Sequence, residues 1–432
     1  MNGYGARALS AFIAGIAVNG GRRGLQLRMI FMLSMCLLAA PYASLESLAQ
    51  EQGVLGRAIH LVEEPDGEGA GLVIDLSAET THRVDILAAP DRLVLDLDRT
   101  AFQAGTQLSS AKPTGPVLAY RAGLFMAGQS RIVIELARPA LIERADFVRQ
   151  NGIARLVVQI RPVAPERFRA EAEAAKARRL ASRAPEEALI ERKPGAKPLI
   201  VLDPGHGGID PGASGPKGEA EKDIVLAYAK AIAARLTAEG KVEVILTRDD
   251  DRFIALRERV AFARAKGASL FVSLHADSLF GEADVRGASV YTLSDRASDA
   301  AAERAAEKEN RADIAAGIDP GEDKREGVED ILFDLARRET RLFSQIAARE
   351  AAAAFRRSGR LHKVPLRAAG FRVLRAPDMP SILIEIGYLS SPEDLAALLN
   401  EATRDKVSAQ LAEALQRFVV SGRDAINIKA PE

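Results

Sequence analysis

The chain has 432 residues, enough for two or three domains, and 47% of them are hydrophobic, which suffices for ordinary buried cores. Its 59 basic residues balance its 59 acidic residues, so the bulk charge does not indicate a nucleic-acid partner. The only cysteine, Cys36, lies near the N-terminus, which excludes a framework of disulfides within the chain.

Residues 1–49 have the pattern of an export signal. Arginines precede an apolar run at 29–40, which has the length of a signal core and is too short to span a bilayer. Small residues follow this run, so cleavage is expected after Ala43 or Ala49. We therefore expect export with no stable membrane insertion after cleavage; the alternative is a disordered leader.

The next region, 57–163, is predicted to be an all-β sandwich. Short runs with strand propensity recur between turn signals, and Asn151-Gly152 predicts a hairpin between the last two runs. The runs lie at 58–62, 72–76, 84–87, 93–97, 132–136, 142–148 and 156–160. No catalytic constellation is present in this region, so we expect a binding module.

Residues 164–197 are predicted to form a charged linker. Alanine, arginine and glutamate dominate the segment, and prolines lie near both of its ends. Such a composition is typical of a semi-rigid, partly helical connection with a solvated surface.

The region 198–422 alternates strand and helix patterns. This order predicts an α/β domain with a mainly parallel sheet flanked by helices. Strands are expected at 199–202, 242–247, 270–274, 288–293, 371–374 and 382–386, and helices at 224–236, 256–265 and 407–420. Asp203-Pro204-Gly205 is expected to end the first strand, because proline cannot continue a ladder and glycine accepts a turn.

Three residues of this region have the side chains of a catalytic zinc site. His206 follows the first strand, Glu221 begins the next helix, and His275 ends another strand. Parallel strands bring such positions to one edge of a sheet, and two imidazoles with a carboxylate leave a fourth position open for water. The alternative for His206 is an ordinary histidine in a glycine-rich turn.

Glu385 is the single carboxylate in the apolar run 381–388. A buried acid is costly unless it is paired or functional. One interpretation is a general base that takes a proton from a metal-activated water. The other is a core carboxylate bonded to a neighbouring loop.

Four motifs in this region occur together and in a characteristic order. They are Asp203-Pro204-Gly205-His206-Gly207-Gly208, Glu221-Lys222-Asp223, Ser273-Leu274-His275-Ala276-Asp277 and Glu385-Ile386-Gly387-Tyr388-Leu389-Ser390. With them the region resembles the zinc-dependent N-acetylmuramoyl-L-alanine amidases of the amidase-3 family. The upstream sandwich resembles the AMIN module by pattern and position, and the whole order is similar to periplasmic cell-division amidases.

The resemblance implies a reaction and a role for each site residue. His206, Glu221 and His275 would hold Zn²⁺, and Glu385 would be the base that serves the attacking water. The bond cut would be the amide between the lactyl group of N-acetylmuramic acid and L-alanine in peptidoglycan. Arg248 and Arg257 are considered as contacts for substrate carboxylates, with surface ion pairs as the alternative.

Residues 295–338 are longer than a minimal connection between two strands. We expect a helix at 298–314 with no apolar stripe, a Gly/Asp loop, and a helix from Val328 whose stripe, including Leu342, docks on the sheet. By the resemblance, the weakly held first helix blocks the zinc until a LytM-type activator withdraws it. Glu309 is the candidate blocking ligand, with Glu307 and Glu303 in reserve; the alternative is a solvated acidic helix.

Two other functions remain open from the sequence. One is a different zinc peptidase that cuts within the stem peptides of the wall. The other is a non-catalytic scaffold that only binds the wall, which loss of a ligand or of Glu385 would favour.

Overall fold

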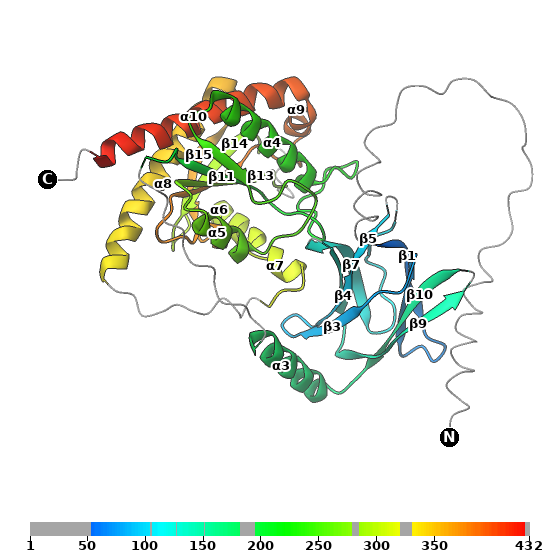
Figure 1. Cartoon of the computed structure of the whole chain (residues 1–432). Helices are drawn as coiled ribbons and strands as arrows, with labels where there is room; N and C mark the ends of the chain where they lie inside the picture. The colour runs from blue at the N-terminus through cyan, green and yellow to red at the C-terminus, as the bar shows by residue number, and fades with distance from the viewer. Residues whose placement is uncertain are drawn as a thin grey trace, which may run out of the picture. The chain divides into compact units, whose positions relative to one another are not determined.

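The computed structural model describes residues 53–103, 106–126, 128–150, 152–181, 195–278, 285–319 and 331–427 (Figure 1). These residues form two compact units that divide near residue 177. The predicted export signal and most of the predicted Gly/Asp loop lie outside the described residues. Within the described part, no helix combines the length and the apolar character needed to cross a membrane.

The N-terminal unit consists of two five-stranded sheets, in agreement with the predicted sandwich. Their strand orders are β5-β1-β2-β10-β9 and β3-β4-β8-β7-β6, and apolar side chains from both sheets form one core. The strands are β1 (Val54–Glu63), β2 (Ala70–Leu76), β3 (His82–Leu87), β4 (Arg92–Asp98), β5 (Thr100–Phe102), β6 (Ser109–Ser110), β7 (Val117–Met126), β8 (Gln129–Leu136), β9 (Ala140–Gln150) and β10 (Ile153–Pro162).

The hairpin prediction for this unit is confirmed. Strands β9 and β10 pair antiparallel with Gln150 opposite Ile153. The sequence patterns missed β5 and β6, which have only three and two residues, and β7, whose apolar alternation is interrupted by Arg121 and Gly123. Helix α3 (Pro165–Ala181) follows β10 where a partly helical linker was expected.

The C-terminal unit contains a six-stranded sheet of order β12-β11-β13-β16-β14-β15. The first four strands are mutually parallel, whereas β14 is antiparallel to β16 and parallel to β15. The strands are β11 (Leu199–Pro204), β12 (Glu243–Leu246), β13 (Leu270–His275), β14 (Ala288–Leu293), β15 (Leu361–Ala369) and β16 (Ser381–Glu385). The predicted mainly parallel α/β sheet is confirmed.

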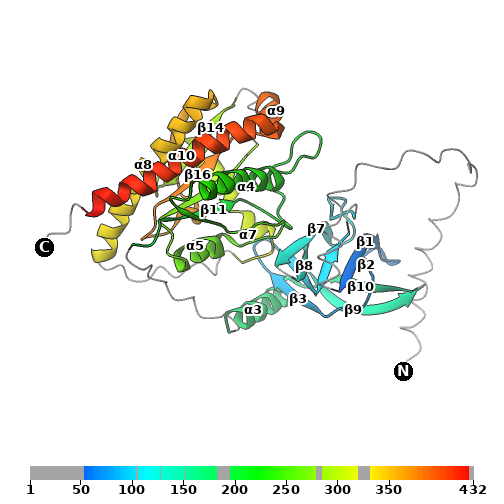
Figure 2. The ribbon, with the colours of Figure 1, turned by 45° about the horizontal axis from the view of Figure 1, so that its top comes forward.

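Helices cover both faces of this sheet (Figures 1 and 2). They are α4 (Glu221–Glu239), α5 (Leu256–Ala265), α6 (Ala300–Glu309), α7 (Ala312–Ala315), α8 (Ile331–Ser358), the 3-10 helix η3 (Arg372–Leu374), α9 (Pro392–Leu399) and α10 (Glu401–Asn427). Helices α4, α8 and α10 share one core with Ile200 and Leu202, while α5 and α6 share another with Leu199 and Val201. Alternate residues of β11 thus face opposite layers.

Two strand predictions are wrong in this unit. Within the predicted strand at 371–374, residues 372–374 form the 3-10 helix η3 instead, and the edge strand is β15. A short apolar run such as this one does not distinguish a strand from a helical turn.

The second difference concerns β11, which continues through Pro204, and Pro204 pairs with Leu274 of β13. The pairing with β12 ends at Leu202, so the missing N–H of Pro204 interrupts no ladder on that side.

The docking of α8 differs from its prediction at one position. Phe343 and Ile346 pack against the core, but the side chain of Leu342 is 53% exposed.

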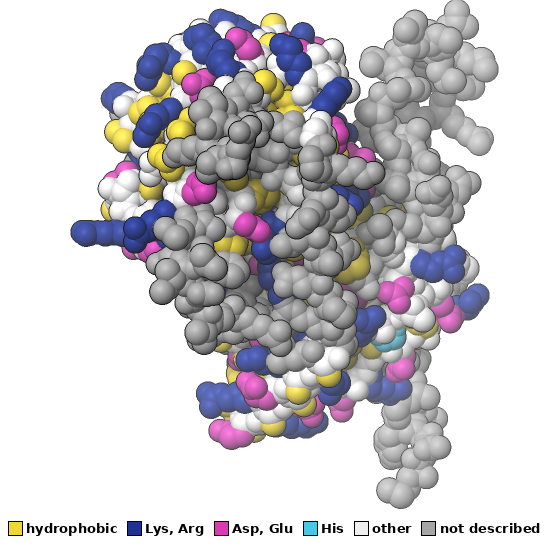
Figure 3. All heavy atoms as spheres, turned by 60° about the vertical axis from the view of Figure 1, so that its left-hand side comes forward, with side chains coloured by type: hydrophobic (Ala, Val, Ile, Leu, Met, Phe, Trp, Pro, Cys, Tyr) yellow, Lys and Arg dark blue, Asp and Glu magenta, His cyan; other side chains and the backbone are white. Residues whose placement is uncertain are grey.

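Figure 3 shows basic and acidic side chains scattered together over one face of the molecule, as the balanced composition indicates.

Candidate metal centre

His206 lies two residues after the end of β11. Its φ of 58° lies in the left-handed region, which is unusual for a residue other than glycine and typical of constrained functional positions. Its Nδ1 lies 2.7 Å from Oδ2 of Asp210. A carboxylate can only accept, so Nδ1 donates to Asp210 and Nε2 faces the centre.

Glu221 is the first residue of α4 and is completely buried. The backbone N–H groups of Ala213 and Ala276 donate to its Oε2 and Oε1 respectively, both at 2.8 Å. These bonds fix the carboxylate, and its Oε1 lies 3.2 Å from His206 Nε2 and 3.2 Å from His275 Nδ1.

His275 is the last residue of β13, as predicted, and it is buried. Its ring packs against the backbone of Gly205, where a Cβ would lie 2.5 Å from His275 Nε2. A side chain at position 205 would therefore displace the imidazole. Gly205 of the first motif therefore leaves room for the imidazole of His275 in the third motif.

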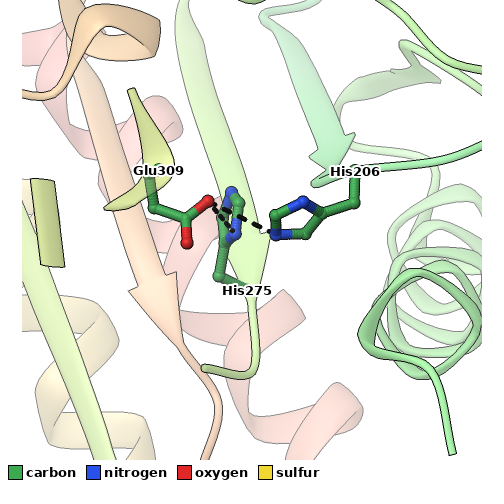
Figure 4. Close-up of side chains that lie close together, drawn as sticks. All are labelled: His206, His275 and Glu309. Carbon is green, nitrogen blue, oxygen red and sulfur yellow. Dashed lines mark ion pairs between the residues drawn. The ribbon is translucent and has the colours of Figure 1, made fainter. Parts of the chain in front are cut away.

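Glu309 ends α6 and brings a second carboxylate to the two imidazoles (Figure 4). Its Oε2 lies 3.3 Å from His206 Nε2 and 3.1 Å from His275 Nδ1. Glu303 and Glu307, the two reserve candidates on the same helix, are exposed. Of these three acids, only Glu309 reaches the centre.

The donor atoms of this cluster suit a divalent metal ion. Four distances of 3.1–3.3 Å join the imidazole nitrogens of His206 and His275 to the carboxylate oxygens of Glu221 and Glu309. Ligands about 2.0 Å from a tetrahedral zinc ion are separated by about 3.3 Å. In addition, His206 Nε2 and both oxygens of Glu309 are buried without a hydrogen-bond partner. Buried polar atoms of this kind require a partner, and a cation between the imidazoles and the carboxylates would be one for His206 Nε2 and Glu309 Oε2.

The electrostatics of the cluster agree with a cation site. Burial alone lowers the pKa of His275, but Glu309 and Glu221 outweigh it and raise that pKa to about 10. Burial raises the pKa of Glu309, but His275 and His206 lower it far below its usual value. Two buried carboxylates thus demand positive charge, which two protonated imidazoles or one divalent metal ion can supply.

Glu385 lies beside the cluster. It ends β16 and pairs in register with His275, so the two side chains leave neighbouring strands on the same face. Its Oε2 accepts the N–H of Asp277 at 2.9 Å, and its Oε1 is buried without a partner. Burial and the Asp277 carboxylate raise the pKa of Glu385 well above its usual value, which suits a group that accepts a proton.

The expectation that the first helix of the insertion has no apolar stripe is wrong for α6. Alanines rather than large apolar residues form its buried face: Ala302, Ala305 and Ala306 pack into the core that includes α5. The side chain of Asp299 caps its N-terminus by accepting the N–H of Ala302 at 2.8 Å. A search for bulky residues misses a stripe of alanines, although they permit close helix packing.

The segment after α6 is fixed as well. The amide of Asn310 donates to Gly370 O at 3.0 Å and accepts the N–H of Arg372 at 2.8 Å. Asp313 is buried and accepts the N–H of Leu256, the first residue of α5, at 2.9 Å. Glu309 is therefore held between a capped helix and an anchored turn.

Comparison with known proteins identifies the region that carries this cluster. The N-acetylmuramoyl-L-alanine amidase model matches residues 200–417, and the AMIN domain model matches residues 59–160. AmiA of Escherichia coli is 40% identical over 222 residues, which cover 51% of this chain and 76% of that protein. The chain belongs to the N-acetylmuramoyl-L-alanine amidase family.

Two other amidases match this chain over a similar share of its length. AmiA of Salmonella typhimurium is 40% identical over 52% of this chain and 77% of that protein. AmiC of Neisseria meningitidis is 36% identical over 52% of this chain, but the match covers only 53% of its own length. His206, Glu221, His275, Glu309 and Glu385 all lie inside the segment matched by the amidase family model.

Behind the cluster of this amidase, a buried ion pair supports the loop that carries His206. Arg259 Nη1 donates to Asp203 Oδ1 at 2.8 Å, and both side chains are buried. Arg259 also donates to the carbonyl oxygens of Pro204 and His206, at 2.8 and 2.7 Å. Sequence analysis missed Arg259, although its place between Leu256 and Val260 on the apolar stripe of α5 was the signal.

Arg248 has neither of the roles considered for it. It is completely buried and donates to the carbonyl oxygens of Pro204, Gly205 and Lys222, at 3.0, 2.7 and 2.9 Å. Burial, together with the neighbouring Arg259, lowers its pKa to about 10. Arg248 therefore fixes the backbone of the first motif and does not face a substrate. Arg257 is exposed, and its suggested contact stays a prediction.

We expect Arg259→Met to lower the free energy of unfolding by about 3–5 kcal/mol, because Asp203 would remain buried without its cation. Zinc retention should fall too, since the His206 loop loses its carbonyl contacts. Chemical denaturation and metal analysis measure both effects. Arg264→Met, on the same helix, removes a more exposed ion pair with Asp378 and should cost at most about 1 kcal/mol. Equal effects of the two substitutions would contradict the supporting role of Arg259.

Proposed function

We propose that this chain is a zinc-dependent hydrolase of the amide between the lactyl group of N-acetylmuramic acid and L-alanine in peptidoglycan. The observation that carries the proposal is that His206 Nε2 and His275 Nδ1 each lie 3.1–3.3 Å from a carboxylate oxygen of Glu221 and from one of Glu309. Membership of the amidase family supports the bond that is cut.

His206, Glu221 and His275 would hold the ion, each fixed by its own partner in the fold. The chemistry that zinc supplies when bound is Lewis acidity at the scissile carbonyl and a lower pKa for water. Glu385 then accepts a proton from the attacking water and returns it to the leaving nitrogen. Its burial beside His275 supports this role, because a dry carboxylate with a raised pKa binds a proton readily.

We further propose that the enzyme is exported to the periplasm, acts in septal wall splitting and is held inactive by α6. The contact of Glu309 with both imidazoles supports the block, because a carboxylate there fills the position that substrate requires. A LytM-type activator would withdraw the helix. The AMIN match supports a separate wall-targeting module, and the pattern of residues 1–49 supports export.

The test uses Glu309→Ala protein, because the unmodified chain is expected to be nearly inactive. Digestion of purified peptidoglycan should release free stem peptides, identified by mass spectrometry. Chelation should abolish the release, and added zinc should restore it. His206→Ala in the same background should lose both zinc and hydrolysis, whereas His60→Ala, at an exposed position of β1, should lose neither.

The products separate the proposed function from its two alternatives. A peptidase acting within the stem would release shortened peptides and leave the sugar-linked amide intact. A wall-binding scaffold would cosediment with peptidoglycan and release nothing, even after zinc is added. Either outcome in the Glu309→Ala protein would overturn the proposed amidase activity.

A further inference from the structure

A second charged residue of α6 reaches into the centre beside Glu309. The ammonium group of Lys308 forms an ion pair with Asp277 Oδ1. The Lys308 side chain is 41% exposed, whereas that of Asp277 is only 2% exposed. The helix thus delivers an ammonium group to Asp277 and a carboxylate to the two imidazoles from consecutive positions.

Asp277 lies directly against the proposed base. Its N–H donates to Glu385 Oε2 at 2.9 Å, and its carbonyl oxygen accepts the N–H of Leu389 at 2.7 Å. The N–H of Ser278 donates to Asp277 Oδ1 at 2.5 Å. The backbone of the residue is therefore fixed on both sides, and its carboxylate lies next to the group that would return a proton to the leaving nitrogen.

The pair of charges on α6 corresponds to the two products of amide hydrolysis. Water adds its oxygen to the carbonyl carbon, the C–N bond breaks, and both protons of the water end on nitrogen, which leaves a carboxylate and an ammonium ion. Glu309 presents a carboxylate to the donor atoms of the metal centre, and Lys308 presents an ammonium ion to Asp277.

We infer that α6 imitates the products and that Asp277 binds the leaving amine during hydrolysis. The inference rests on the proposed amidase function. Asp277 is buried and interacts with the carboxylates of Glu221, Glu309 and Glu385, and a buried acid among other acids is costly without a cation. When α6 withdraws, Lys308 leaves with it. The nitrogen of the substrate becomes cationic as the C–N bond breaks. It would then take the place of the Lys308 ammonium group at the Asp277 carboxylate.

Two substitutions at this ion pair should act in opposite directions. Lys308→Met should raise the basal hydrolysis of peptidoglycan by the otherwise unmodified chain, because it removes one attachment of α6. Asp277→Asn in the Glu309→Ala background should reduce hydrolysis on the order of 10- to 100-fold, the effect of losing a charged hydrogen bond to the leaving nitrogen. If Asp277 only fastened the helix, Asp277→Asn would raise hydrolysis as Lys308→Met does.

A binding measurement gives a readout that does not depend on turnover. We would titrate zinc-loaded Glu309→Ala protein with L-alaninamide and with N-acetyl-L-alaninamide, using saturation-transfer NMR. The free amine should bind at least about tenfold more tightly than the acetylated compound, because only the amine offers a cation to Asp277. Asp277→Asn should remove this preference while zinc content and thermal unfolding stay unchanged.

The outcomes separate the inference from the proposed function. If the Glu309→Ala parent hydrolyses peptidoglycan while Asp277→Asn changes neither hydrolysis nor the preference for the free amine, the inference alone is overturned. If the parent releases no stem peptides, the proposed function is overturned and the inference fails with it. If Asp277→Asn misfolds, two other measurements still test the inference. Equal binding of the two compounds by the Glu309→Ala parent would count against it. An unchanged rate of basal hydrolysis in Lys308→Met would count against it as well.

Discussion

Glu385→Gln in the Glu309→Ala background is expected to abolish most hydrolysis of peptidoglycan while leaving zinc bound. Glutamine preserves an oxygen that can accept the N–H of Asp277, so the local structure should survive. It cannot take up a proton, and loss of a general base costs about 10²–10⁴-fold in rate. Peptide release measured by mass spectrometry, together with metal analysis of the same preparation, checks both parts of the prediction.

The matched control is Glu393→Gln, the same substitution at an exposed position eight residues further along the chain. It should leave both rate and zinc content unchanged. Full activity in Glu385→Gln would show that another group serves as the base. Loss of zinc together with activity would instead make Glu385 part of the metal centre, which is not the role assigned to it.

Glu309→Ala should raise the basal hydrolysis of purified peptidoglycan on the order of 10- to 100-fold. This increase corresponds to a contribution of about 1.4–2.8 kcal/mol from Glu309 to the free energy of docking α6 on the centre. The carboxylate contacts both imidazoles, so its removal opens the position opposite Glu221. The buried alanines of α6 remain, so a second substitution, Ala302→Glu, should open the centre further by making the docked helix costly.

Glu307→Ala is the control for this prediction, because Glu307 is exposed on the same helix, two residues from Glu309. It removes the same charge without touching the centre, and basal hydrolysis should not change. A folded, zinc-loaded Glu309→Ala, Ala302→Glu protein with no gain over the unmodified chain would exclude α6 as the block.

The sequence predicted those elements whose hydrophobic pattern is long or regular. The bounds of α5 and β14 agree with the predicted ranges. Residues 371–374 were misassigned because their apolar side chains can be buried equally well by a strand or a single turn. Strand β15 was missed because it is an edge strand with exposed residues such as Val364.

The candidate site was predictable to the extent that its residues stand at ends of elements. Glu221 begins α4, His275 ends β13 and His206 lies two residues after β11, and the topology of the sheet brings these positions together. Asp210, Arg259 and Asp277 were not assigned roles, because their importance depends on which side chains meet across the fold. Sequence spacing does not show that Arg259 reaches the carbonyl of His206 or that Lys308 reaches Asp277.

The position of α6 within the chain affects how its block would respond to concentration. The helix lies between β14 and β15 of the sheet that carries the centre, so it is tethered at both ends to its own target. A tethered group has an effective concentration that reaches millimolar values for short connections, whatever the concentration of the protein. Dilution after export therefore would not activate the enzyme, and once an activator dissociates, the same helix can return to the same centre. If α6 is the proposed block, each molecule would carry one inhibitor that it cannot lose, and the active state would last only as long as the proposed activator stays bound.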